Sequence, residues 1–158
     1  SGTARRRFDS LAQEAYLSLW RTYDRLKRLE DELFDARGLS AQQYNTLRLL
    51  AAAAPATLTV QQLAEKLISR APDMTRLLDR LEAGGWIRRA RPSENRRVVQ
   101  VGLTPAGEAL LDELAAQVRE CHERQLGHLT AARQRELIRL LAAARAPHEP
   151  PDSAWRSG

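Results

Sequence analysis

Apolar and polar residues follow the period of an α-helix over most of the chain. Between Ala4 and Arg37, apolar side chains recur at steps of three and four residues, which predicts one amphipathic helix. No proline or glycine interrupts this segment, and Gly38 ends it. At about 1.5 Å per residue, such a helix is about 50 Å long. Because a small domain cannot cover that length, we expect its apolar face to need a partner.

Capping signals divide the next part of the chain into short helices. The segments SAQQ from residue 40 and TVQQ from residue 59 have the order of a capping box, in which a hydroxyl residue and a glutamine three positions later satisfy each other's backbone amides. They predict helices over 40–54 and 59–68. A third helix is expected over 72–83, with Pro72 at its first position and two glycines after its end. The tight turn before this third helix gives a helix-turn-helix pattern.

The pattern then changes to that of a β-hairpin. Residues 86–91 and 97–101 are predicted to be strands, and the polar segment 92–96 joins them. A helix-turn-helix followed by a hairpin is a winged helix. The predicted fold class is therefore mostly α, with a winged helix-turn-helix between long terminal helices.

Two more helices and a tail complete the chain. Thr104 caps a helix that has Pro105 at its first position and is expected to reach about residue 125. Thr130 caps a final helix with its own apolar face. The tail from Pro147 has three prolines in five residues and is expected to be disordered.

Positive charge collects on the helix-turn-helix and the hairpin. The 158-residue chain has a formal net charge of +5 at pH 7, and most of its basic residues are arginines. Ser69 to Arg97 contains eight arginines against four acidic residues, whereas Glu108 to Arg145 contains six of each. Arginine suits bidentate contacts with phosphates and with guanine edges. This asymmetry favours a nucleic acid over a membrane as the partner.

No pattern in the sequence indicates an enzyme, a metal site or a cofactor. Cys121 and His122 are adjacent on a predicted helix, point about 100° apart and cannot form a nucleophile and base pair. As the single cysteine, Cys121 excludes an internal disulfide and a cysteine-based zinc site within one chain. No apolar run reaches the about 18 residues of a membrane span. We expect a cytoplasmic protein that does not enter the membrane.

The ordered set of motifs resembles the MarR family of bacterial transcription regulators. The resembling segments read LSAQQYNTLRLL, LTVQQLAEKL, APDMTRLLDRLEAGGWIRR and RPSENRRVVQVGLTPAGEALL, which cover residues 39 to about 111. The helices on either side match the family in position and length. The resemblance implies a dimerisation helix at 1–38, a winged helix-turn-helix DNA-binding region at 39–103, dimerisation helices at 104–146 and a tail at 147–158.

This resemblance implies a homodimer that binds double-stranded DNA at a pseudo-palindromic operator. The uncovered apolar faces of the terminal helices agree, because a two-fold dimer would cover them. Members of the family are commonly repressors that respond to small aromatic or phenolic effectors. Two alternatives stay open. A winged helix that binds only proteins would have an uncharged recognition helix, and a thiol redox sensor would use Cys121, whose place on an apolar stripe favours packing instead.

The helix over 72–83 is the expected recognition helix, which docks in the major groove by its first turns. Arg76 is the first candidate for a base contact, because it matches an arginine common at this place in the family. Asp73 fits helix capping better than a contact with cytosine. Asp79 and Arg80 are alternatively expected to pair with Arg88 or Arg89. The candidate DNA contacts on and before this helix are Ser69, Arg70, Pro72, Asp73, Thr75, Arg76 and Arg80.

The hairpin is the expected wing, and Arg91, Arg96 and Arg97 are its candidate DNA contacts. An arginine at a wing tip is attracted to the negative potential of a narrow minor groove. Family members usually have an aspartate shortly before the two tip arginines, and Glu94 or Asn95 occupies that place here. Asn95 could orient a neighbouring arginine only by a neutral hydrogen bond.

An effector site is expected from the aromatic residues of the first two helices. In the family, effectors bind in a cleft between the dimerisation helices and the winged helix. Core packing is the alternative role for the residues proposed here. The candidate wall residues are Tyr16, Trp20, Tyr23, Tyr44 and Arg48.

Overall fold

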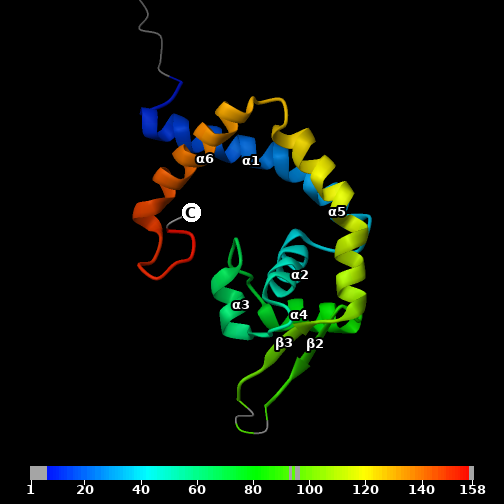
Figure 1. Cartoon of the computed structure of the whole chain (residues 1–158). Coiled ribbons are helices and arrows are strands. Elements are labelled where there is room, and N and C mark those ends of the chain that lie inside the picture. The colour runs from blue at the N-terminus through cyan, green and yellow to red at the C-terminus, as the bar shows by residue number, and fades with distance from the viewer. Residues whose placement is uncertain (1–6, 93, 95–96, 157–158) are drawn as a thin grey trace, which may run out of the picture.

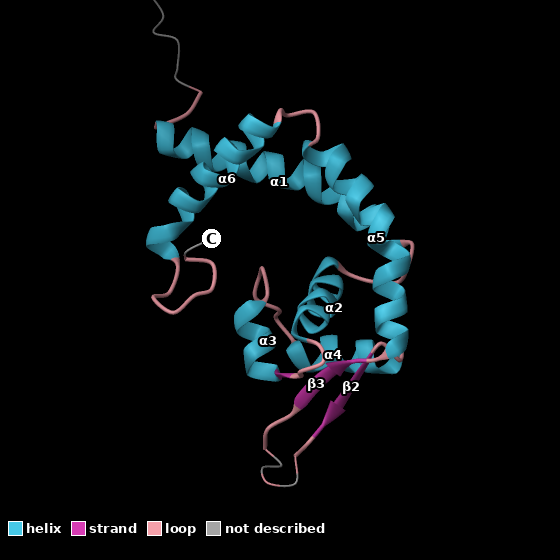
Figure 2. Cartoon of the chain, viewed as in Figure 1, coloured by secondary structure: helices cyan, strands magenta, loops and turns pink. Residues whose placement is uncertain are grey.

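The structure is a computed structural model that describes residues 7–92, 94 and 97–156. Six α-helices and three short strands make up this described part (Figure 2). The elements are α1 (Leu11–Asp35), α2 (Ala41–Ala53), β1 (Leu58–Thr59), α3 (Val60–Lys66), α4 (Met74–Ala83), β2 (Ile87–Ala90), β3 (Gln100–Leu103), α5 (Pro105–Leu126), α6 (Ala131–Arg145) and the 3₁₀ turn η1 (Ala146–His148).

The elements form two regions that α5 connects (Figure 1). Helices α1 and α6 and the end of α5 form an arch at one side of the molecule. Helices α2, α3 and α4 and the sheet form a compact unit below it, from which the β2–β3 hairpin projects away from the arch. The predicted winged helix with long terminal helices is therefore confirmed.

The sheet has the strand order β1-β3-β2, and both pairings are antiparallel. Leu58 of β1 lies opposite Val101 of β3, and Arg89 of β2 lies opposite Val101 on its other side. Val101 is fully buried, so the centre of the hairpin base is part of the core. The strand β1 was missed by the sequence analysis, because two residues are too few to show an alternating pattern.

Helix α5 belongs to two packed regions along its length. Its first half places Leu110, Leu111 and Leu114 in the core of the winged helix. Its second half packs on α1, where the side-chain amide of Gln125 donates to the carbonyl of Leu26 at 2.9 Å. One continuous helix therefore joins the winged-helix unit to the arch.

Side-chain caps set most helix starts. The capping boxes at Ser40 and Thr59 are both present, as predicted. The first helix begins at Leu11 and not at Ala4, because the Ser10 hydroxyl accepts from the backbone N–H three residues later at 3.0 Å. Residues 1–6 lie outside the described residues. The expected start at Pro72 is also wrong, since Asp73 is the N-cap of α4.

Helices α1 and α6 leave apolar side chains exposed in the single chain. Phe34 is the one buried residue of α1, and none of the fifteen residues of α6, all of which are described, is buried. No helix in the described part of the chain is long and apolar enough to cross a membrane. The exposed large apolar residues of the two helices are Leu11, Tyr16, Leu17, Leu19, Trp20, Tyr23, Ile138 and Leu140.

The tail differs from the expected disorder over the residues that are described. After η1, the Glu149 carboxylate forms an ion pair with Arg145 at 3.4 Å and accepts a hydrogen bond from the Ser153 hydroxyl at 2.7 Å. The guanidinium of Arg145 also lies 5.7 Å from the centre of the Trp155 ring. These contacts fold the proline-rich segment back on the end of α6, which a composition argument does not detect.

Candidate nucleic-acid interface

Helix α4 buries one side in the core and exposes Arg76 and Arg80 on another. Leu77, Leu78 and Leu81 anchor it in the core. Asp73 caps it, because its carboxylate accepts from the backbone N–H of Arg76 at 2.9 Å. The capping role expected for Asp73 is confirmed. The candidate contacts on and before this helix are all exposed, namely Ser69, Arg70, Pro72, Asp73, Thr75, Arg76 and Arg80.

Two side chains of α2 fix the turn that precedes α4. The amide of Gln42 donates to the Ser69 hydroxyl and to the Arg70 carbonyl, both at 3.3 Å. The side-chain oxygen of Asn45 accepts from the backbone N–H of Ile68 at 3.1 Å. Neither residue could be predicted from the sequence, because their partners lie more than twenty positions away and no local motif links them. The turn is therefore positioned by the helix behind it.

The wing consists of β2, β3 and the loop between them. Its second strand begins at Gln100, three residues later than expected, and the Gln100 side chain accepts from the Thr57 hydroxyl at 2.8 Å. Arg91 and Arg97 are exposed at the two sides of the loop. Arg96 and Asn95 lie outside the described residues.

An ion-pair cluster connects the wing to α4. The Arg89 guanidinium lies 2.7 Å from a carboxylate oxygen of Asp79 and 3.0 Å from one of Glu82. The backbone N–H of Arg89 also donates to the second oxygen of Glu82, at 3.1 Å. The hydrogen bond that the Arg89 guanidinium donates to Glu82 lowers the pKa of Glu82 and raises the pKa of Arg89. The expected pairing of Asp79 with a wing arginine is confirmed for Arg89, and Arg80 takes no part in it.

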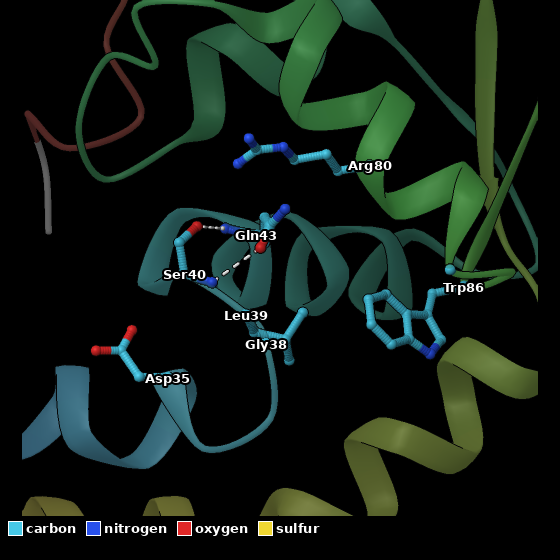
Figure 3. A pocket seen from close by; sticks show the side chains of 8 residues that line it. Asp35, Gly38, Leu39, Ser40, Gln43, Arg80 and Trp86 are labelled. Carbon is cyan, nitrogen blue, oxygen red and sulfur yellow. Dashed lines mark hydrogen bonds between the residues drawn. The ribbon is translucent and has the colours of Figure 1, made fainter.

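A cavity of about 570 Å³ lies between the α1–α2 turn and α4 (Figure 3). In the figure, the Arg80 side chain lies over the start of α2, and the Trp86 ring stands at the other side of the opening. Gly84 lets this ring approach, because a Cβ on Gly84 would lie 2.8 Å from it. The lining residues are Asp35, Gly38, Leu39, Ser40, Gln43, Arg80, Gly84 and Trp86.

Comparisons with known proteins match this arrangement over most of the chain. The model of the MarR family matches residues 39–99, from the turn before α2 to the wing. The crystal structure of a MarR transcription factor from Planctomyces limnophilus is 59% identical, with a TM-score of 0.69, and covers 85% of this chain and 98% of that one. The chain belongs to the MarR family.

Two further proteins similar to this MarR chain are a MarR variant in complex with operator DNA and a transcriptional regulator. A cysteine-to-serine variant of MarR from Escherichia coli, in a crystal structure with operator DNA, is 26% identical with a TM-score of 0.74, and the match covers 86% of this chain and 99% of that one. The HTH-type transcriptional regulator FarR of Neisseria gonorrhoeae is 34% identical over 91 residues, which are 58% of this chain. The match spans 61% of FarR, less than two thirds of its length.

The expected effector residues of this MarR chain do not come together in the single chain. Tyr16 and Trp20 are more than half exposed on α1, with their ring centres 6.3 Å apart. Tyr44 is half-buried and stacks on Phe34 at 4.7 Å, and burial raises the pKa of its hydroxyl. Arg48 is exposed. Tyr23 is exposed on α1 as well, and none of the five expected residues lines the cavity between α1 and α4.

The cysteine of this MarR chain is placed for packing. Cys121 is buried on α5, and burial raises the pKa of its thiol, with a smaller effect of the Glu30 carboxylate. A redox-reactive cysteine needs a stabilised thiolate and access to solvent. Both observations support the packing role over the redox alternative.

Proposed function

We propose that the chain is a transcription regulator that binds double-stranded DNA sequence-specifically, as a homodimer on a pseudo-palindromic operator. The observation that carries this proposal is that α4 exposes Arg76 and Arg80 while its apolar side is anchored in the core and its two acidic residues are paired with Arg89 of the wing. The relative in complex with operator DNA supports it. A cytoplasmic location, where an operator is accessible, is part of the proposal.

The homodimer would form through the arch. Helices α1 and α6, which carry exposed apolar side chains, lie at the side of the molecule opposite the wing (Figure 1). A two-fold related copy covers such faces and places its own recognition helix at a fixed distance. Half-sites one helical turn, or about 10 base pairs, apart fit that geometry.

The arginines would have different roles in DNA binding. Arg76 lies in the first turn of α4, whose start enters the major groove, so it reads a base edge. Arg91 and Arg97 would contact the phosphates of the neighbouring groove, where an arginine is attracted to a narrow minor groove. The remaining contacts, Ser69, Arg70, Pro72, Thr75 and Arg80, border the same face of the helix and its preceding turn.

Two substitutions separate base reading from phosphate binding. Arg76→Ala is expected to cost about 1–3 kcal/mol on a duplex that the wild-type chain selects from a randomised library, and to relax one base pair in each half-site. Arg97→Ala is expected to weaken binding to all sequences and to lower the salt slope by about one. Titrations of each variant at several salt concentrations, against the selected duplex and a scrambled one, give both quantities. Equal losses on both duplexes for both variants would show a protein that holds DNA without reading it.

The cavity of about 570 Å³ between the α1–α2 turn and α4 is the proposed site of an aromatic or phenolic effector. Its walls come from the α1–α2 turn and from the recognition helix, so a bound molecule would contact both regions. Arg80 can bind an anionic group, and Trp86 offers a planar ring. Such a ligand changes the affinity for DNA only if it binds more tightly to one orientation of α4, either the one that fits DNA or one that does not.

A screen of benzoates and phenols tests the effector proposal. The tryptophan emission should respond in wild type and Trp20→Phe chains, and the response should vanish in Trp86→Phe. The same compound should release the selected duplex, which makes the regulator a ligand-responsive repressor where the operator overlaps a promoter. A response that disappears in Trp20→Phe instead would place the effector on the exposed face of α1.

A further inference from the structure

Arg89 occupies a distinct place among the arginines of the wing. Side chains alternate along β2, so Ile87 and Arg89 face α4, while Arg88 points to solvent. The Arg89 side chain is 25% exposed, whereas Arg88 and Arg91 are exposed residues. Arg89 is thus the basic side chain that the strand turns inwards.

Its two partners stand on one face of the recognition helix. Asp79 and Glu82 are three residues apart, so their carboxylates are neighbours on α4. One nitrogen of the guanidinium, Nη2, contacts both of them. Glu82 also accepts from the backbone of Arg89 with its second oxygen, and therefore fixes the strand as well as the side chain. A single exposed ion pair is weak, but this cluster defines the position of the backbone.

The charges of the cluster are unfavourable for direct DNA binding. Two carboxylates surround one guanidinium, which leaves a net charge of −1 beside the helix that exposes Arg76 and Arg80. Phosphates repel such a group, so charge alone predicts that a DNA-binding helix is better without it. A positional role explains why the acidic pair stands there.

We propose that Arg89 is a positioning residue, which holds the wing in register with the recognition helix and makes no contact with DNA. This inference rests on the proposed DNA-binding function. Strand β2 ends at Ala90, one residue beyond Arg89, and the chain then leads to Arg91 and the wing loop. The orientation of the wing arginines relative to α4 therefore depends on the fixed point that Arg89 provides near the end of the strand.

Loss of this fixed point reduces the fraction of chains that can place helix and wing together. The apparent dissociation constant rises in inverse proportion to that fraction. A wing aligned for a tenth of the time thus weakens binding about tenfold without removing any contact to DNA. The number of phosphates bound, and with it the salt slope, stays the same.

The variants that test this inference separate position from charge. Arg89→Gln removes the ion pairs, and Arg89→Lys keeps the charge with a shorter, unforked head group. The double variant Asp79→Asn with Glu82→Gln removes two negative charges and leaves Arg89 in place. The control is Glu65→Gln, an exposed acidic residue on α3 that is not part of the cluster. Each dimer is titrated with the duplex that the wild-type chain selects, at several salt concentrations.

Arg89→Gln is expected to bind about tenfold more weakly with an unchanged salt slope, and Arg89→Lys to lie between it and the wild type. The double variant is expected to bind more weakly than the wild type, although charge alone predicts the opposite. Glu65→Gln should bind at least as tightly as the wild type. A salt slope lowered by about one in Arg89→Gln, or a double variant that binds more tightly than the control, would overturn the inference.

A measurement without DNA tests the same inference independently. The amide of Arg89 donates to Glu82, so its hydrogen exchange should accelerate in Glu82→Ala, which has no side-chain acceptor, and less strongly in Glu82→Gln, which accepts more weakly than a carboxylate, if Glu82→Ala does not fold. Unchanged exchange in a folded variant would refute the positioning role. A wild-type chain that selects no duplex would refute the proposed function instead, and the exchange experiment would still decide the role of Arg89.

Discussion

Gly107 gives the sharpest stability prediction, because two physical effects predict opposite signs for its substitution. It lies in the first turn of α5, where it donates to the Thr104 cap at 3.1 Å. By helix propensity alone, Gly107→Ala stabilises the helix by up to about 1 kcal/mol. A Cβ at this position, however, would lie 2.2 Å from the carbonyl oxygen of Trp86 and 2.6 Å from a methyl group of Leu103.

The magnitude follows from that distance. An ordinary contact of a Cβ begins at 3.4 Å, so α5 has to move away from the base of the wing by about an ångström. The same Trp86 oxygen accepts the backbone N–H of Thr104 at 3.1 Å, and this hydrogen bond lengthens in the shift. Overpacking of this kind costs about 1–3 kcal/mol, which exceeds the gain in propensity. Because the approach of 2.2 Å to a backbone oxygen is severe, we take the upper part of this range, about 2–3 kcal/mol, which after the gain of about 1 kcal/mol leaves a net loss of about 1–2 kcal/mol for each chain.

Thermal unfolding measures this loss at one matched protein concentration, because the midpoint of a dimer depends on concentration. A chain of this size loses about 2–4 °C of Tm for each kcal/mol. The matched control is Ala109→Gly, an exposed position two residues further along α5, which should lose about 1 kcal/mol by propensity. If Gly107→Ala unfolds at or above the wild-type temperature while the control loses stability, the close approach of α5 to the wing is not as described.

Three further predictions follow from the arch and its polar groups. Sedimentation equilibrium should show a dimer at micromolar concentration, and deletion from Thr130 onward should abolish both dimer and DNA binding; a monomeric full chain would contradict the assembly. Burial raises the pKa of Glu30, so the folded state favours its protonated form and loses stability as the pH rises through the folded pKa. Glu30→Gln should therefore have a higher Tm than the wild type at pH 7 and an equal one below the glutamate range; a lower Tm at pH 7 would contradict this. Cys121 should react with a disulfide reagent far more slowly in the folded chain than in denaturant at the same pH, and equal rates would show that the thiol is accessible.

Local signals made the helical part of the fold predictable. The capping boxes at Ser40 and Thr59 place the starts of α2 and α3 correctly, since all their hydrogen bonds lie within four residues. Ser10 and Gln13 have the same spacing of a hydroxyl residue and a glutamine. It was not used to place the start of α1, because the apolar period of the segment extends further toward the N-terminus. The hairpin was located from its alternation, although its second strand is shorter than the pattern indicates.

Contacts between distant segments could not be predicted from the sequence. Gln42 and Asn45 position the turn before α4 through partners that no spacing rule connects to them. Asp79 could be assigned a wing arginine, but the choice between Arg88 and Arg89 needed the twist of β2 relative to α4. The aromatic residues of α1 were expected in a cavity because their type suits one. In the single chain they form an exposed apolar face instead, which the proposed homodimer would cover.

Helix α5 packs in two separate regions, and this restricts how the chain can change over evolution. Its first half packs into the core of the winged helix and its second half packs on α1. The helix therefore fixes the rotation of one packed face relative to the other about its axis. Insertion of one residue between Leu114 and Cys121 would rotate one set of contacts by about 100° and move it by about 1.5 Å. Chains that adapt to operators of different spacing should therefore vary in the connections at either end of α5 and conserve the number of residues within it.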